Sequence, residues 1–266
     1  MYKPNSAKNT SEALLLLFRL IETNEWSKLY NMYLDTEEDC KTFQYLAKIV
    51  AKSSSFNGMT ILHAVTRFDP SCALVKRIVE LCPNAPAARD VLNRTPLHVA
   101  AGTGAACVVI KFLVDTYPEA CLVQDTDGRT PLHMACDTST ELFEDNRNGK
   151  AFRTAPAHRS IGVLLRASLD SAIVEDEDGM SAIEYALCSD AELPTVRLIQ
   201  KAAQKVRVRE HEADRKAKAD AWKECRRVSI EKSSGSSNNE GVAETARSVR
   251  RRGGLSRSLI RSAQAA

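Results

Sequence analysis

The phrase Thr-Pro-Leu-His stands at residues 95–98 and again at 130–133, and the related phrase Thr-Ile-Leu-His stands at 60–63. Successive copies are 35 residues apart. A period of this length is typical of a stack of supersecondary units, each of which buries its apolar face against its neighbours. The spacing therefore predicts a solenoid before any single residue is considered.

The residues around each phrase predict a helical hairpin. A turn precedes each copy, with Gly58, Asn93 or Gly128 where the backbone would need a positive φ. A short run of small apolar residues follows and would form the first helix. Larger apolar residues at helical spacing then indicate a second helix, and Pro83 and Pro118 end it at matching positions. In the first two units these larger residues are Leu74, Ile78, Leu81, Val109, Leu113 and Val114.

The phrase and its surroundings resemble the ankyrin repeat over about residues 55–205. The resemblance implies an all-α solenoid of stacked helix-turn-helix units with hairpin loops. It also implies that His63, His98 and His133 are structural, with rings that bond within and between the hairpin loops. The departures are Ile61 and Ala182 where the family has Pro, Leu92-Asn93 in place of Asp-Gly, and Glu184 in place of His.

A fourth, degenerate copy predicts about four units and one insertion. The turn 176–180 leads into Ser-Ala-Ile-Glu at 181–184, 51 residues after the third phrase instead of 35. Because Leu164 and Val174 still align with Leu113 and Val123, the 16 extra residues must fall between the two helices of the third unit. We place the insertion at 137–155.

The N-terminal 54 residues predict a helical cap for the solenoid. Amphipathic patterns indicate helices at 11–22, 25–34 and 37–51, which could cover one apolar end of the stack. The run of leucines at 14–17 is broken at once by Arg19 and Glu22, so we expect neither a secretory signal nor a membrane span. The expected location is intracellular and cytoplasmic, with the nucleus as an alternative.

The C-terminal part of the chain differs from the rest in charge. Residues 1–200 carry a net charge of −6 and residues 201–266 carry +9. A long helix is predicted from Pro194 to about Lys232, and its segment 206–232 has little apolar surface and should be charged and solvent-exposed. Residues 233–266 predict a disordered basic tail that is simply solvated, acts as an import signal or contacts an anionic surface. Ser229 follows two arginines and is a candidate phosphorylation site.

The residues offer no support for catalysis, a cofactor or a metal. The three repeated histidines would lie about ten ångströms apart, whereas one zinc ion needs ligands at ~2 Å. No nucleophile-base pair or phosphate loop is evident. The eight cysteines are scattered without a Cys-x-x-Cys pair, and we interpret them as reduced core thiols. We predict that the protein is not an enzyme, and that no cofactor and no metal are bound.

What remains is a binding surface. The ankyrin resemblance implies that partners dock on the hairpin tips and on the exposed ends of the first helices. The row of tips is apolar at one end and acidic at the other. An alternative is that the N-terminal cap already covers Phe56 and Leu92. The candidate partner-binding residues are Phe56, Met59, Arg67, Phe68, Val91, Leu92, Arg94, Thr126, Asp127, Arg129, Asp137, Glu177, Asp178 and Met180.

Three functions follow from these features. The first is a monomeric, non-catalytic adaptor or scaffold that binds a partner protein through the hairpin tips and the concave helix face. The second is a binder of nucleic acid or anionic membrane that acts through the basic tail and would lose affinity steeply with salt. The third is an enzyme, which no motif supports.

Overall fold

The computed structural model describes residues 7–138 and 157–234. These residues form an all-α structure with no strand, as the sequence predicted, apart from one isolated bridge between Glu175 and Ser181. The α-helices are α1 (Ala7–Glu22), α2 (Trp26–Tyr33), α3 (Glu37–Lys52), α4 (Ile61–Thr66), α5 (Cys72–Leu81), α6 (Pro96–Thr103), α7 (Cys107–Thr116), α8 (Pro131–Cys136), α9 (His158–Ala167), α10 (Ala182–Cys188) and α11 (Leu193–Ser234). Short 3-10 turns are η1 (Ser54–Phe56), η2 (Ala85–Ala87), η3 (Pro118–Leu122) and η4 (Asp170–Ile173).

Four helices begin where the repeated phrase predicts them. Thr60, Thr95, Thr130 and Ser181 are the N-cap residues of α4, α6, α8 and α10, and each forms a reciprocal capping box with the residue three positions later. In such a box two otherwise unsatisfied backbone N–H groups of the helix end are bonded at once. The local sequence therefore fixes the start of the first helix of every unit.

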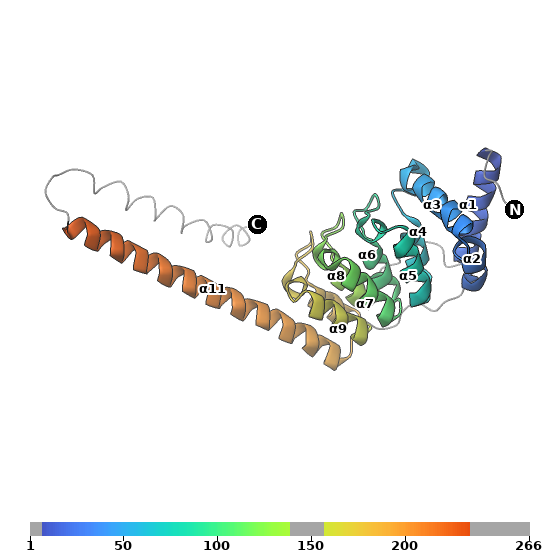
Figure 1. Ribbon diagram of the computed structural model, residues 1–266. Coiled ribbons are helices and arrows are strands. Elements are labelled where there is room, and N and C mark those ends of the chain that lie inside the picture. The colour runs from blue at the N-terminus through green and yellow to red at the C-terminus, as the bar shows by residue number, and fades with distance from the viewer. Residues whose placement is uncertain (1–6, 139–156, 235–266) are drawn as a thin grey trace, which may run out of the picture. The chain divides into compact units, whose positions relative to one another are not determined.

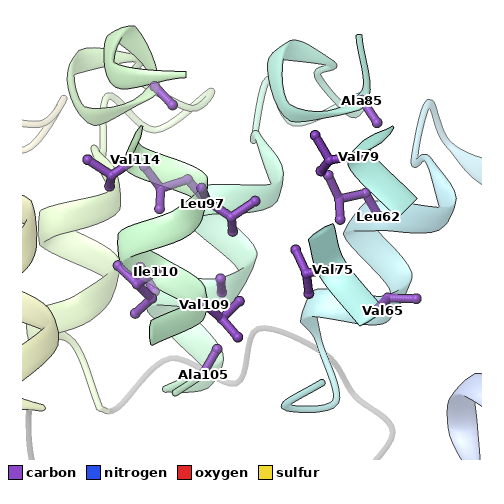
Figure 2. Close-up of a cluster of buried hydrophobic side chains, with 14 of the residues drawn as sticks. Leu62, Val65, Val75, Val79, Ala85, Leu97, Ala105, Val109, Ile110 and Val114 are labelled. Carbon is purple, nitrogen blue, oxygen red and sulfur yellow. The ribbon is translucent and has the colours of Figure 1, made fainter. Parts of the chain in front are cut away.

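The core lies between successive hairpins. Figure 2 shows Leu62, Val75 and Val79 of one hairpin beside Leu97 and Val109 of the next. All five side chains are buried. The first helices supply mainly small or medium side chains, and the second helices supply larger ones, so neighbouring hairpins approach closely. Each fully buried Leu or Val contributes ~1.5–3 kcal/mol relative to an exposed one.

The three N-terminal helices cover the first unit. Leu17, Leu29 and Phe43 are fully buried, one from each of α1, α2 and α3. Phe18 of α1 stacks on Phe56, with 5.0 Å between the ring centroids. The Gln44 side-chain amide of α3 donates to the carbonyl of Leu81 at 2.9 Å, which ties α3 to the end of α5. Figure 1 shows helices α1 to α5 at the N-terminal end of the molecule.

The third unit keeps both helices despite its longer connection. Its first helix, α8, ends at Cys136, and its second helix, α9, begins at His158. Ile161 and Leu164 of α9 are buried in the same core as Leu113 of α7. The predicted insertion at 137–155 falls, from residue 139 on, outside the described residues.

Helix α11 starts as part of the core and continues without it. Val196, Ile199, Ala202 and Val206 are buried, whereas every side chain from Arg207 to Ser229 is exposed. The chain divides into two compact units, Met1–Glu210 and His211–Ala266, and α11 belongs to both. Among the described residues, no helix combines the length and the apolar character needed to cross a membrane. The predicted disordered tail, from residue 235 on, lies outside the described residues.

Candidate functional site: the hairpin tips

An aspartate organises each of three hairpin tips, and it is buried at Asp90 and Asp125 and half-buried at Asp176. The Oδ1 atom of Asp90 accepts hydrogen bonds from the backbone N–H of Leu92 at 3.0 Å and of Arg94 at 2.8 Å. Asp125 accepts from Asp127 and Arg129 in the same way, and Asp176 accepts from Asp178 and Met180. Because each carboxylate bonds two N–H groups of its own turn, the tip has one conformation before any partner arrives.

The turn also needs a left-handed residue, as the sequence predicted. The residue two positions before each N-cap has a positive φ: +72° at Gly58, +59° at Asn93, +78° at Gly128 and +76° at Gly179. Glycine adopts this conformation without strain, and asparagine tolerates it better than most other residues.

Backbone hydrogen bonds join the tips into a continuous row. The N–H of Val91 donates to the carbonyl of Asn57, that of Thr126 to Leu92, and that of Glu177 to Asp127, at 2.9 to 3.0 Å. Each bond links one tip to the next along the stack. Side chains on different tips are therefore held at fixed spacing, which is what a preorganised binding surface requires.

Two glycines of this row allow a direct test of tip packing. A Cβ atom on Gly128 would lie 2.8 Å from the backbone nitrogen of Glu177, whereas one on Gly179 would meet nothing within 4 Å. We expect Gly179→Ala to lower the free energy of unfolding by ~1–2 kcal/mol, since the only cost is the strain of a non-glycine residue at positive φ. Gly128→Ala should cost at least ~1 kcal/mol more, because backbone atoms of the next tip must also move. Urea denaturation of the two variants measures the difference, and equal costs would show that the tips are not in contact.

The repeated histidines connect neighbouring units, in agreement with the structural role that the resemblance implied. The Nδ1 atom of His98 accepts the backbone N–H of Thr95 at 3.1 Å. Its Nε2 atom must then carry the proton, and it donates to the carbonyls of Val123 at 3.1 Å and Arg129 at 3.3 Å. His63 bonds Thr60 and the carbonyl of Arg94 in the same manner.

The third histidine makes a different junction. Nδ1 of His133 accepts the N–H of Thr130 at 3.0 Å, and its buried Nε2 faces the backbone carbonyls of Val174 and Met180 in a geometry poorer than that at His98. The ring also packs edge-on against Tyr185, with 5.7 Å between centroids, and the Tyr185 hydroxyl donates to Asp176 at 2.7 Å. Although burial alone would raise the pKa of Asp176, the hydrogen bonds from Tyr185 and from the backbone N–H groups of Met180 and Asp178 lower it.

These histidines make stability depend on pH. Burial lowers the pKa of His98 to about 3, and it also lowers the pKa values of His63 and His133. A histidine whose pKa is lowered by folding stabilises the protein fully above its unfolded value of about 6.5. We expect this contribution of His98 to fall as the pH drops from about 6.5 to about 3, by ~1.4 kcal/mol per pH unit.

The variant His98→Gln isolates this contribution of His98. Glutamine does not ionise but keeps an oxygen that can accept the Thr95 N–H, as Glu184 accepts the N–H of Ser181 in the fourth unit. The unfolding free energy of the variant, measured by urea denaturation at several pH values, should fall less steeply on acidification than that of the wild type. Parallel curves would contradict the assignment.

Two of the predicted binding residues are arginines with structural roles. Arg94 forms a two-pronged ion pair with Asp90, with its Nε and Nη2 atoms 2.9 and 2.8 Å from Oδ2. The side chain of Arg94 is 11% exposed and that of Asp90 is 1% exposed. Arg129 pairs with Asp125 at 3.4 Å and also with Asp127. The guanidinium groups of both predicted binding residues fold back onto the turn that carries them, so each stabilises its own tip.

The structure separates the other candidates by exposure. Asp137 is buried, because α8 ends at Cys136 and the N–H of Asp137 bonds back to His133, so its predicted exposure was wrong. Arg67 and Phe68 are half-buried, and the guanidinium of Arg67 lies over the Phe68 ring. Phe56, Met59 and Met180 are half-buried as well. The exposed candidates are Val91, Leu92, Thr126, Asp127, Glu177 and Asp178.

The exposed candidates divide into an apolar and an acidic part. Val91 is 63% exposed and Leu92 is 44% exposed, and both lie on the second tip. The alternative that the N-terminal cap covers the apolar end applies to Phe56, which stacks on Phe18, but not to Leu92. Glu177 and Asp178 of the fourth tip are joined on the surface by Glu175. The tip surface, as we call these eight residues, comprises Val91, Leu92, Thr126, Asp127, Glu175, Glu177, Asp178 and the half-buried Met180.

The sequence analysis missed the aspartates that build the tips. A signal was present, since Asp90, Asp125 and Asp176 each precede an N-cap residue by five positions. The first unit has Ser55 at the corresponding position, and there the 3-10 turn η1, capped by Ser53, replaces the aspartate-centred turn.

The candidate phosphorylation site lies outside the repeats. Ser229 is exposed on α11, and its hydroxyl donates to the carbonyl of Cys225 at 2.8 Å.

Among the described residues, no group of three His, Cys, Asp or Glu side chains is placed to hold a metal ion. Of the eight cysteines, Cys40, Cys121 and Cys136 are buried, and Cys188 and Cys225 are exposed.

The structure consists of stacked two-helix units, and in each unit a hydrogen-bonded hairpin tip precedes the capped first helix. This arrangement defines a helical repeat protein. Residues 62–145 match the family model described as ankyrin repeats, in three copies. The chain therefore contains ankyrin repeats, as the sequence predicted. A comparison with curated proteins gave no match. The fourth unit lies beyond the matched residues. It resembles the other units in the capping box of Ser181 and in the turn that Asp176 stabilises.

Proposed function

We propose that the protein is a non-catalytic adaptor that binds a partner protein through the tip surface. Ankyrin repeats generally mediate protein-protein interaction. One observation carries the proposal for this chain: Val91 and Leu92 are exposed together on a tip that hydrogen bonds hold rigid on both sides. Exposed apolar side chains on a preorganised turn favour burial by a partner, because little conformational entropy is lost on binding.

The charges beside this pair specify the chemistry of the partner. Asp127, Glu175, Glu177 and Asp178 are exposed carboxylates on the third and fourth tips. Arg129 of the third tip already pairs with Asp125 and Asp127. We infer that the partner segment places an apolar side chain at Val91 and Leu92 and basic side chains along the acidic tips, since such complementarity speeds association and fixes register.

The spacing of the tips suggests a register. Packed helices lie ~8–10 Å apart, and an extended chain advances ~3.3 Å per residue, so one repeat corresponds to about three residues of an extended partner. The proposed segment therefore has Leu or a similar residue followed by Lys or Arg three and six positions later.

Labelled peptides test this proposal. We expect the full chain to bind a peptide with this pattern, and replacing both basic residues by Glu should weaken binding roughly tenfold, measured by fluorescence anisotropy at fixed salt. Moving the basic residues to the other side of the leucine is the matched control and should weaken binding similarly. Equal affinity for all three peptides would contradict the proposed register.

The basic-tail alternative rests on residues outside the described part of the chain. Removal of residues 235–266 distinguishes the two functions. A truncated protein that keeps its peptide and protein partners supports the tip surface, whereas loss of all binding on truncation, together with steep salt dependence, would support the tail.

A further inference from the structure

A pocket of about 390 Å³ lies where the N-terminal helices meet the first ankyrin unit. It is bounded by α3, by the start of α4 and by the end of α5 with the turn that follows. Phe43, Ile61, Ile78 and Leu81 give it mainly apolar walls. This volume is within the ~300–1,000 Å³ range of pockets that bind small molecules.

The pocket exists because α3 presents small side chains at this place. Ala47 and Ala51, one helical turn apart on α3, line the cavity and occupy little of its volume. Ala47 is only half-buried, although it packs against the hydrophobic core. The small side chains leave a pocket that opens to solvent at this junction, and a ligand could fill it.

A polar rim accompanies the apolar walls. Lys48, Gln44 and Cys82 also line the pocket. Gln44 is held by its bond to the Leu81 carbonyl. Lys48 is exposed and forms no ion pair within the described residues, and its charge acts on the Cys82 thiol, whose pKa burial raises and Lys48 lowers. An unpaired ammonium group therefore stands beside an apolar cavity.

We propose that this pocket binds a small amphiphile, with its apolar body between α3 and α5 and its carboxylate paired with Lys48. The cavity accounts for the apolar body, and the unpaired lysine accounts for the anionic head, by charge complementarity. A methylene group takes up roughly the ~30 Å³ share of a water molecule, so a saturated carboxylate of about ten carbons has a suitable size.

Titration calorimetry of the full chain tests the site with decanoate and decanol as probes. We expect both to bind, with decanoate tighter. Lys48→Gln should weaken decanoate binding roughly fivefold and leave decanol binding unchanged. Lys52→Gln, which removes another lysine of α3 that does not line the pocket, is the matched control and should have no effect. Equal losses for the two variants would overturn the role of Lys48.

A second pair of measurements tests the location. Ala47→Trp should fill the cavity and lower the affinity for both probes tenfold or more, with helicity checked by circular dichroism. In the wild type, saturating decanoate should slow alkylation of Cys82 several-fold and leave that of the exposed Cys225 unchanged, as followed by mass spectrometry of the modified peptides. Absence of decanoate binding, or binding that leaves Cys82 alkylation unchanged, would overturn the proposal even if Ala47→Trp failed to fold.

Discussion

Replacing Asp90 by alanine is expected to destabilise the protein by ~3–5 kcal/mol. The substitution removes the buried carboxylate that pairs with the guanidinium of Arg94, whose side chain is only 11% exposed. It also removes the acceptor of the Leu92 and Arg94 backbone N–H groups. Both losses act in the same direction, because a buried charge and buried donors are costly when left unpaired. Urea denaturation of the full chain measures the change.

Two further variants separate the causes. Asp90→Asn keeps an oxygen for the two N–H groups but removes the charge, so its cost should be intermediate. Asp127→Ala removes a carboxylate that is 62% exposed and pairs with Arg129 at the surface, and it should cost no more than ~1 kcal/mol. If Asp90→Ala cost as little as Asp127→Ala, the buried pair would not be what holds the second tip together.

The helix starts and turn conformations could be predicted from the sequence because they depend on neighbouring residues. A Thr or Ser whose side chain bonds the residue three positions later defines a helix start within one turn of chain. A Gly or Asn two positions earlier supplies the positive φ that the turn requires. The 35-residue period then applies the same local result to each unit in turn.

The roles of the tip side chains could not be predicted in the same way. Arg94 and Arg129 look exposed in the sequence, since they stand in polar turns, but both fold back onto an aspartate four positions earlier. Asp137 looks like the exposed end of a helix, yet it is buried. In each case the exposure of the side chain depends on the tertiary conformation of the turn. The hydrophobic periodicity of the sequence does not predict that conformation.

The pocket beside α3 was likewise hidden from the sequence. Ala47 and Ala51 are ordinary residues of an amphipathic helix, and nothing in their spacing indicates that they face a cavity. The cavity arises where the small side chains of α3 face the start of α4 and the end of α5. Features that depend on packing between distant elements need the structure.

The largest effect on binding is expected from the double variant Val91→Glu and Leu92→Glu. Two exposed apolar side chains would become charged, which removes the proposed anchor and places carboxylates where the partner's apolar side chain would be buried. Loss of such an anchor typically costs at least ~2 kcal/mol, which is about thirtyfold in affinity. The melting temperature should stay near the wild-type value, because surface substitutions usually change stability by less than ~0.5 kcal/mol.

Val108→Glu is the matched control for this variant. Val108 is an apolar residue of α7 with an exposure of 60%, close to the 63% of Val91, but it does not belong to the tip surface. Partner capture by wild type, the double variant and Val108→Glu should be compared by affinity purification and quantitative mass spectrometry. The adaptor proposal requires that specific partners disappear only with the double variant, since both substitutions remove exposed valine but only one changes the tips. If all three proteins captured the same partners, the tip surface would not be the binding site, and residues 235–266 would be the next segment to remove.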